Sequence, residues 1–273
     1  KASRLWTGAT NSLLDINGLR HVMQPSVNYA FVPRPSAVPS QLPQFDSESP
    51  ASLLLPVDFY DYNNIDSIDS QNVIRFGIRN TLQTKRADQV DNLVDWNLMM
   101  DWRLNPQSAQ PTFANQQTFS DLYSDLTFRP RAWVGVVSQL RYDINGSDLN
   151  LAFHQLALTP NDRWSWGLGH LYLRNGFLGA GDNFITSTMF YRVNENWGLR
   201  SLHNFNAQNG RLQEQHYTIY RDLRSWTGAL TFRVNDNGIG PKDYTIAFTF
   251  SLKAHPRYAV GDDTVQAYHL VGE

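Results

Sequence analysis

Six arginines and two aspartates are the residues of this chain that could most clearly take part in binding or ion pairing. Each falls on the polar side of a segment in which polar and apolar residues alternate: Arg75, Arg79, Arg103, Arg141, Arg200 and Arg233, with Asp95 and Asp101. Such arginines could guide an anionic passenger through a water-filled channel. They could equally form a balanced lining of ion pairs. The sequence favours neither interpretation over the other.

Histidine and serine offer a second possible chemistry. The seven histidines are scattered, and none shows the spacing of a metal-binding motif. His170 and His203 each follow a tryptophan by six residues, and Ser201 precedes His203 by two. A lipid hydrolase would need a serine and a histidine within hydrogen-bond reach of each other, with an orienting third residue that the sequence does not supply. Contact with lipid headgroups is the simpler interpretation of the two histidines, and we expect no catalytic residue.

Oxygen ligands for a cation gather in one segment only. This group comprises Asp58, Asp61, Asp66 and Asp69. Their spacing matches no calcium-binding loop, so a solvated acidic loop is the simpler interpretation. Cysteine is absent, which excludes a thiolate nucleophile and a cysteine metal site. We therefore expect neither a metal nor a cofactor.

Strands with two unlike faces must position these residues. The clearest is Tyr244–Lys253, whose apolar residues are Tyr244, Ile246, Phe248, Phe250 and Leu252 and whose small or polar residues are Thr245, Ala247, Thr249 and Ser251. This period of two predicts a β-strand. In a barrel the apolar face meets lipid and the polar face meets a wet lumen. The six arginines, Thr245 and Thr249 are accordingly predicted to face the lumen.

Strands of this kind recur along the whole chain. The predicted strands are 22–32, 71–83, 92–104, 120–128, 132–143, 148–158, 163–173, 184–193, 196–206, 211–221, 226–234 and 243–253, with room for two more in the first twenty residues. Tight connections alternate with longer ones rich in Gly and Asn, as on the periplasmic and extracellular sides of a barrel. The longest connection, 33–70, is predicted to be an extracellular loop.

A short polar turn followed by tryptophan occurs four times, at Trp133, Trp164, Trp197 and Trp226. The intervals of 31, 33 and 29 residues each fit one hairpin of a transmembrane barrel. Trp164, Trp197 and Trp226 share the apolar face of their strands and are predicted to form an interfacial girdle. Trp133 is out of phase, which predicts a bulge or an inward-pointing ring.

Composition agrees with an envelope protein. Aromatic residues make up 13% of the 273 residues and charged residues 18%, and no stretch is apolar for long enough to form a membrane-spanning helix. The net charge of −2 argues against a nucleic-acid partner. We predict an all-β, antiparallel transmembrane β-barrel, or the C-terminal part of a larger one, of about 12 or more strands. It would occupy residues 1–253 in the cell outer membrane of a Gram-negative bacterium, with 254–273 as a tail.

Four ordered segments resemble the LPS-assembly protein family (LptD). The first runs from Leu19-Arg20-His21 through Pro25 and Tyr29 to Phe31-Val32-Pro33. The others are Asn72–Asn80, Phe128–Asp143 and Tyr220–Trp226 with the strand after it. Many family members carry cysteines just before the position of Trp226, where this chain has Arg224 and Ser225. Disulfide-controlled maturation is therefore not expected in this region.

The resemblance implies a barrel that delivers lipopolysaccharide to the outer leaflet. Its implied partners are a periplasmic LPS bridge protein, a plug lipoprotein in the lumen and the outer-membrane lipids. The sugars would pass through the lumen while the acyl chains leave by a lateral gate between first and last strands. The chain would be the C-terminal part of that barrel, with Tyr244–Leu252 as the closing strand and one wall of the gate. A passive porin-like channel and an outer-membrane lipid hydrolase are the alternatives.

Overall fold

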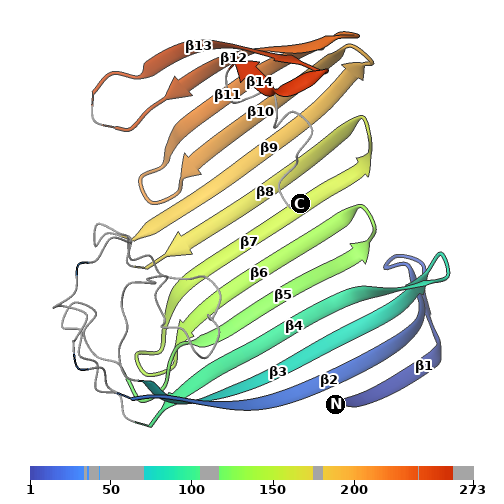
Figure 1. The fold of residues 1–273 in the computed structure, drawn as a ribbon, viewed down its shortest axis with the longest axis vertical. Helices are drawn as coiled ribbons and strands as arrows, with labels where there is room; N and C mark the ends of the chain where they lie inside the picture. The colour runs from blue at the N-terminus through green and yellow to red at the C-terminus, as the bar shows by residue number, and fades with distance from the viewer. Residues whose placement is uncertain are drawn as a thin grey trace. The chain divides into compact units, whose positions relative to one another are not determined.

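The structure is a computed structural model that describes residues 1–33, 36, 43, 71–104, 117–174, 181–238 and 240–260. Within these residues, fourteen β-strands form one sheet, and their order in the sheet is their order in the chain (Figure 1). Paired neighbours run antiparallel. The described residues contain no α-helix, and none therefore that is long and apolar enough to cross a membrane. The all-β, antiparallel prediction is confirmed.

The strands in the described residues are six to seventeen residues long. They are β1 (Ala2–Asn11), β2 (Ile16–Val32), β3 (Gln71–Arg86), β4 (Gln89–Arg103), β5 (Leu122–Arg131), β6 (Val134–Asp143), β7 (Asp148–Asn161), β8 (Trp164–Leu173), β9 (Asp182–Asn194), β10 (Trp197–Asn206), β11 (Arg211–Asp222), β12 (Trp226–Asn235), β13 (Asp243–Leu252) and β14 (His255–Val260).

The chain contains two compact units, which are described separately below. The first unit comprises Lys1–Pro130, Val137–Phe153 and Leu173–Gly181. The second unit comprises Arg131–Val136, His154–Tyr172 and Asp182–Glu273.

All twelve strands predicted from the sequence are present, with two differences at the ends of the sheet. The first twenty residues hold β1 and the start of β2, because β2 begins at Ile16 rather than near residue 22. Gly18, with a φ of 73°, and the polar residues around it interrupt the alternation that marks the rest of that strand. At the other end, β14 occupies part of the predicted tail and pairs with β13 at Phe250↔Val260 and Leu252↔His255.

Connections alternate between short and long, as predicted. Those that follow odd-numbered strands are short and include 87–88, 132–133, 162–163 and 195–196. Those that follow even-numbered strands include the 33–70 segment and the 104–121, 174–181 and 236–242 connections. We call the two ends of the strands the short-turn end and the long-loop end.

Each unit has an apolar face and a polar face, because successive side chains of a strand point to opposite sides. On the apolar face of the first unit, Val27 of β2 pairs with Phe76 of β3, which pairs with Met100 of β4. On that of the second unit, one row runs from Leu199 through Ile219 and Leu230 to Phe248. These rows are rich in large exposed side chains, whereas the buried Arg75 and buried threonines such as Thr218 and Thr231 lie on the opposite face. The alternation predicted from the sequence is therefore present in both units.

Candidate functional site

The polar face of the first unit contains a buried, two-point ion pair. The Arg75 guanidinium donates from Nε to Oδ1 of Asp101 over 2.7 Å and from Nη2 to Oδ2 over 2.8 Å. The two residues face each other on β3 and β4, and their side chains are 8% and 3% exposed. A planar guanidinium and a planar carboxylate joined by two parallel hydrogen bonds form the strongest common type of ion pair.

The other predicted arginines of this face also have partners. Arg79 donates from Nε to Asp95 over 2.8 Å, and Arg141 contacts Asp121 over 3.0 Å. Asp121 also accepts a hydrogen bond of 3.0 Å from the amide of Asn150, while Arg103 donates to the carbonyl oxygen of Gln117 over 3.1 Å. Between the two interpretations that the sequence left open, the first unit therefore has the balanced ion-pair lining. Asp121 and Asn150 were not identified from the sequence.

The polar face of the second unit is built differently. Arg200 of β10 faces Thr218 of β11, and Arg233 of β12 faces Thr245 of β13. Thr249 faces Ala229 and is 3% exposed. A threonine thus lies opposite each of the two predicted arginines here. All of these positions lie on the polar face, whereas their orientation toward a lumen stays a prediction.

The predicted gate strand is β13. It pairs with β12 at ten consecutive positions but with β14 at only two. Ile246, Tyr244 and Phe248 are 74%, 64% and 64% exposed, because along most of β13 only one neighbouring strand covers them. Leu252 and Phe250 complete the same apolar face. Since β14 follows it, β13 is not the last strand of the sheet, and its role as a gate stays a prediction.

Two girdle tryptophans owe their position to asparagine-capped turns. The side-chain oxygen of Asn194 accepts hydrogen bonds from the backbone N–H groups of Asn196 (2.9 Å) and Trp197 (3.0 Å). Asn161 does the same for Arg163 (2.9 Å) and Trp164 (3.2 Å). Asparagine in this position mimics a backbone turn. Each tryptophan is therefore the first residue of its strand and begins its apolar face.

Trp226 and Trp133 differ from this pattern. Trp226 also begins its strand, and its ring packs against Phe250 at a centroid distance of 5.3 Å. A Cβ on Gly228 would lie 2.9 Å from the Trp226 ring, so the glycine leaves room for it. Trp133 lies in the turn before β6 and is 40% exposed. It is out of phase because it belongs to the turn, where the alternation of the strand does not yet apply.

The histidines contact neighbouring strands on the apolar face. His203 approaches the hydroxyl of Tyr217 at 3.1 Å, and His170 approaches the amide oxygen of Asn183 at 3.0 Å. The His170 ring also stacks on His154, with 5.8 Å between ring centroids. Neither His170 nor His203 is hydrogen-bonded to Ser201 in the described part of the chain. The tyrosine and asparagine partners had no signal in the sequence.

A network at the short-turn end of the first unit centres on Arg86, which sequence reasoning did not single out. Its Nη2 lies within hydrogen-bond distance of the carbonyl oxygens of Leu14 (3.0 Å), Arg129 (3.0 Å) and Pro130 (2.8 Å). Because Nη2 carries two hydrogens, these three oxygens share them. Nη1 contacts Asp91 over 2.8 Å.

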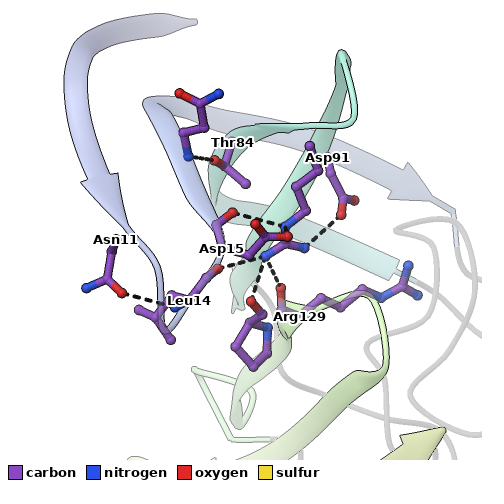
Figure 2. A network of polar contacts seen from close by, with 9 residues as sticks. Asn11, Leu14, Asp15, Thr84, Asp91 and Arg129 are labelled. Atoms are coloured by element: carbon purple, nitrogen blue, oxygen red, sulfur yellow. Dashed lines mark hydrogen bonds and ion pairs between the residues drawn. The ribbon is translucent and has the colours of Figure 1, made fainter. Parts of the chain in front are cut away.

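This network joins the β1–β2 turn, the β3–β4 hairpin and the end of β5 at the short-turn end. Figure 2 shows Leu14 and Asp15 from the β1–β2 turn, Asp91 from β4 and Arg129 from β5 converging on one point. The Arg86 side chain is only 9% exposed, and its Nε also lies 3.3 Å from the carbonyl oxygen of Asp15. One cation thus contacts backbone carbonyl oxygens from the β1–β2 turn and from the end of β5.

The acidic segment with Asp58, Asp61, Asp66 and Asp69 lies outside the described residues, so its cation-binding capacity stays untested. Within the described ranges, no group of three or more histidine, aspartate or glutamate side chains could hold a metal ion.

A comparison with protein families shows which family the chain belongs to. Residues 9–197 match the family LptD, LPS transport system D, which is more than half of the 273 residues. The chain belongs to the LptD family. LptD is a component of lipopolysaccharide transport and not an enzyme family, and the chain is accordingly an LPS-transport protein. No curated protein matches the chain.

The matched range places three of the four segments that resemble LptD inside the family region. These are Leu19–Pro33, Asn72–Asn80 and Phe128–Asp143. The ion-paired polar face of the first unit, the Arg86 network, Trp164 and Trp197 also lie in this range. Tyr220–Trp226 and β13 lie beyond it, so the C-terminal position of the chain in a larger barrel stays a prediction.

Proposed function

We propose that the sheet is part of the wall of an outer-membrane β-barrel that delivers lipopolysaccharide to the outer leaflet. The sugars of the passenger travel along the polar face, and its acyl chains leave through a lateral gate that includes β13. A plug lipoprotein occupies the lumen, and a periplasmic LPS bridge protein supplies the passenger. The short-turn end faces the periplasm, and the long-loop end faces the cell exterior.

The family relationship carries this proposal, and the two faces of the sheet support it. The large exposed side chains of the apolar face include Val27, Tyr191, Ile219, Leu230 and Ile246. In water such a surface would promote aggregation, but in lipid it is the expected outer wall of a barrel. The polar face pairs its charges or flanks them with hydroxyls, as a wet lining requires.

The pairing of β13 supports the proposed gate. Its backbone groups along Tyr244–Thr249 have no strand partner on the side away from β12 in the described residues. Unpaired backbone groups are costly in hydrocarbon, so a seam at this edge opens only when lipid or another strand compensates for the lost hydrogen bonds. Thr245, Ala247 and Thr249 are small, which leaves space for sugars on the other face.

Site-specific photo-crosslinking in cells tests the proposal. A photoreactive residue replaces Thr249 on the polar face, and a matched variant carries it at Leu252, on the apolar face at the short-turn end. We expect lipopolysaccharide adducts at position 249 and phospholipid adducts at position 252. If position 249 gives no lipopolysaccharide adduct while the cells still display lipopolysaccharide, the polar face is not the route.

The passive channel and the lipid hydrolase gain no specific support from the described residues. A channel would conduct small ions without a lipoprotein partner. Lipopolysaccharide adducts that depend on that partner would therefore separate transport from passive conduction.

A further inference from the structure

A stacked arginine lies at the short-turn end of the apolar face of the second unit. The guanidinium carbon of Arg221 lies 4.4 Å from the centre of the Trp197 ring. The two residues face each other on β11 and β10, so Arg221 is on the same face as this girdle tryptophan. A cation over an aromatic ring is attracted by the negative face of that ring. The contact fixes the guanidinium at the edge of a surface that otherwise carries large apolar side chains.

A second tryptophan borders Arg221 on its other side. Gly228 of β12 faces Arg221, and the Trp226 ring lies 2.9 Å from the place that a Cβ on this glycine would occupy. Packing against Phe250, with 5.3 Å between ring centroids, holds the Trp226 ring in this position. Arg221 therefore lies between Trp197 and the strand position that the Trp226 ring covers.

The hydrogen-bond donors of Arg221 remain available. The N–H groups of a guanidinium lie in its plane, so stacking on a ring leaves them for another partner. Arg221 is half-buried, and it makes no hydrogen bond or ion pair with the part of the chain that the structure describes. Its neighbour Asp222 points to the opposite face, where its carboxylate lies 2.7 Å from Lys253 and accepts a hydrogen bond of 3.1 Å from Thr227. Glu195 is exposed in the 195–196 turn and forms no ion pair with Arg221.

The apolar face continues from Arg221 toward the long-loop end. Its next row contains the exposed side chains of Leu199, Ile219 and Leu230. A ligand whose anionic group binds Arg221 can therefore lay an apolar chain along these residues. Arg224, exposed in the connection before β12, adds positive charge at the same end. A cation, two amphipathic rings and an apolar strip in this order fit an amphiphile with an anionic headgroup.

We propose that Arg221, Trp197 and Trp226 form a binding site for the headgroup of an anionic phospholipid of the surrounding bilayer. The guanidinium binds the phosphate group, the rings contact the glycerol region, and the acyl chains lie along Leu199 and Ile219. The site rests on the proposed function, which places the apolar face in lipid and the short-turn end at the periplasmic side. The ligand belongs to the bilayer and is not the transported lipopolysaccharide. Its binding fixes the depth of β10–β12 in the membrane.

Competition between two lipids, measured by native mass spectrometry, tests the site. The full protein in detergent is mixed with equal amounts of phosphatidylglycerol and phosphatidylcholine that carry the same acyl chains, so the two lipids differ in headgroup and net charge. We expect the protein to retain phosphatidylglycerol preferentially. Arg221→Gln should weaken this retention on the order of 10-fold, as loss of a hydrogen bond to a charged group does. Retention of phosphatidylcholine should not change.

Two further variants separate the parts of the site. Trp197→Leu keeps an apolar contact and removes the ring that stacks on the guanidinium, so it should weaken retention of phosphatidylglycerol by about 2- to 5-fold. Arg163→Gln is the matched control, because it removes the same charge from the exposed 162–163 turn at the same end of the strands. It should leave the preference unchanged. Inorganic phosphate should not displace phosphatidylglycerol, because it has no acyl chain.

Equal retention of the two lipids by the unsubstituted protein overturns the site. An equal loss of preference in Arg221→Gln and Arg163→Gln also overturns it, because net charge alone would then account for binding. Displacement of phosphatidylglycerol by inorganic phosphate at the same concentration overturns the lipid as the ligand. Unaltered migration of the folded form in gels ensures that each variant reports on binding. If Arg221→Gln does not fold, an unchanged preference in Trp197→Leu overturns the site.

Crosslinking at Leu252 separates this proposal from the proposed function. Leu252 faces Trp226 on β12 and lies on the same apolar face. If position 252 gives no phospholipid adduct, the placement of this end in the bilayer fails. If it gives the adduct and Arg221→Gln leaves the lipid preference unchanged, the placement stands and the headgroup site fails.

Discussion

Arg75 and Asp101 face each other across β3 and β4 because of a single extra residue in β4. From the turn at 87–88 the pairs run from Arg86↔Gln89 to Gln83↔Asn92, and then the register shifts to Leu82↔Val94. Leu93 is the residue without an opposite partner, and its side chain is buried. Without this bulge, counting from the turn would place Met100 opposite Arg75, and Asp101 would lie on the apolar face.

Breaking this pair should destabilise the protein strongly. Arg75→Gln or Asp101→Asn leaves one buried charge without its partner, at an expected cost of about 3–5 kcal/mol. Arg79→Gln is the matched control, because the Arg79 side chain is 54% exposed and the loss of its pair should cost about 0–1 kcal/mol. The temperature at which the folded form disappears from gels measures both effects. If this temperature fell by a similar amount in the two variants, the larger contribution to stability assigned to the buried pair would be contradicted.

Replacing Arg86 should loosen three connections together. Arg86→Gln removes a charged donor shared by Leu14, Asp15 and the end of β5, at a cost of about 1.5–3 kcal/mol. Faster amide hydrogen exchange is expected at 12–15 and 129–133, with the distant 195–196 turn unchanged. Lys85→Gln controls for charge, because Lys85 and its partner Asp88 are both exposed. If exchange became faster only in the 87–88 turn, Arg86 would not hold the β1–β2 turn and the end of β5 together.

The turn before Trp197 should depend on the acceptor of Asn194. Asn194→Ala removes two hydrogen bonds and should cost about 1–2 kcal/mol. Asn194→Asp keeps an acceptor at the same place and should cost much less. Hydrogen exchange at the Trp197 amide, together with thermal stability, measures the difference. Equal losses in the two variants would refute the capping role.

The two-residue turn between β3 and β4 should tolerate glycine better than alanine. Ala87 and Asp88 have φ values of 43° and 64°, and alanine is strained in this left-handed region. Ala87→Gly should therefore stabilise the protein by about 0.5–1 kcal/mol. Ala229→Gly, in a strand and 1% exposed, should have the opposite sign. Chemical denaturation compares the two variants, and destabilisation by Ala87→Gly would refute the assigned strain.

The sequence predicted the strands because their period of two is local. Alternation in Tyr244–Leu252 alone assigns those residues to two faces, and asparagine or glycine in the connections marks where strands stop. Prediction from the sequence failed where this local signal was missing. The start of β2 was assigned too late because Asn17 and Gly18 interrupt the pattern. Trp133 was assigned to a strand although it belongs to the turn.

The candidate site was predicted only in part, since partners depend on register. The sequence predicts a polar side for each arginine, but whether each arginine meets a carboxylate cannot be read from spacing along the chain. Arg75 and Asp101 are 26 residues apart, and Arg86 lies 71 residues from Asp15. A shift of one residue in any pairing changes the partner and the face of every residue beyond it.

The sequence by itself determined that this chain is a series of two-faced antiparallel strands, because side-chain alternation is a property of each strand alone. Its ordered segments also determined its likeness to LptD. The tertiary structure alone decided which arginines are neutralised. The bulge at Leu93 brings Asp101 to Arg75, whereas the pairing of Arg200 with Thr218, and of Thr218 with Thr231, places threonines beside Arg200. That difference arises from pairing between strands, which no single strand contains.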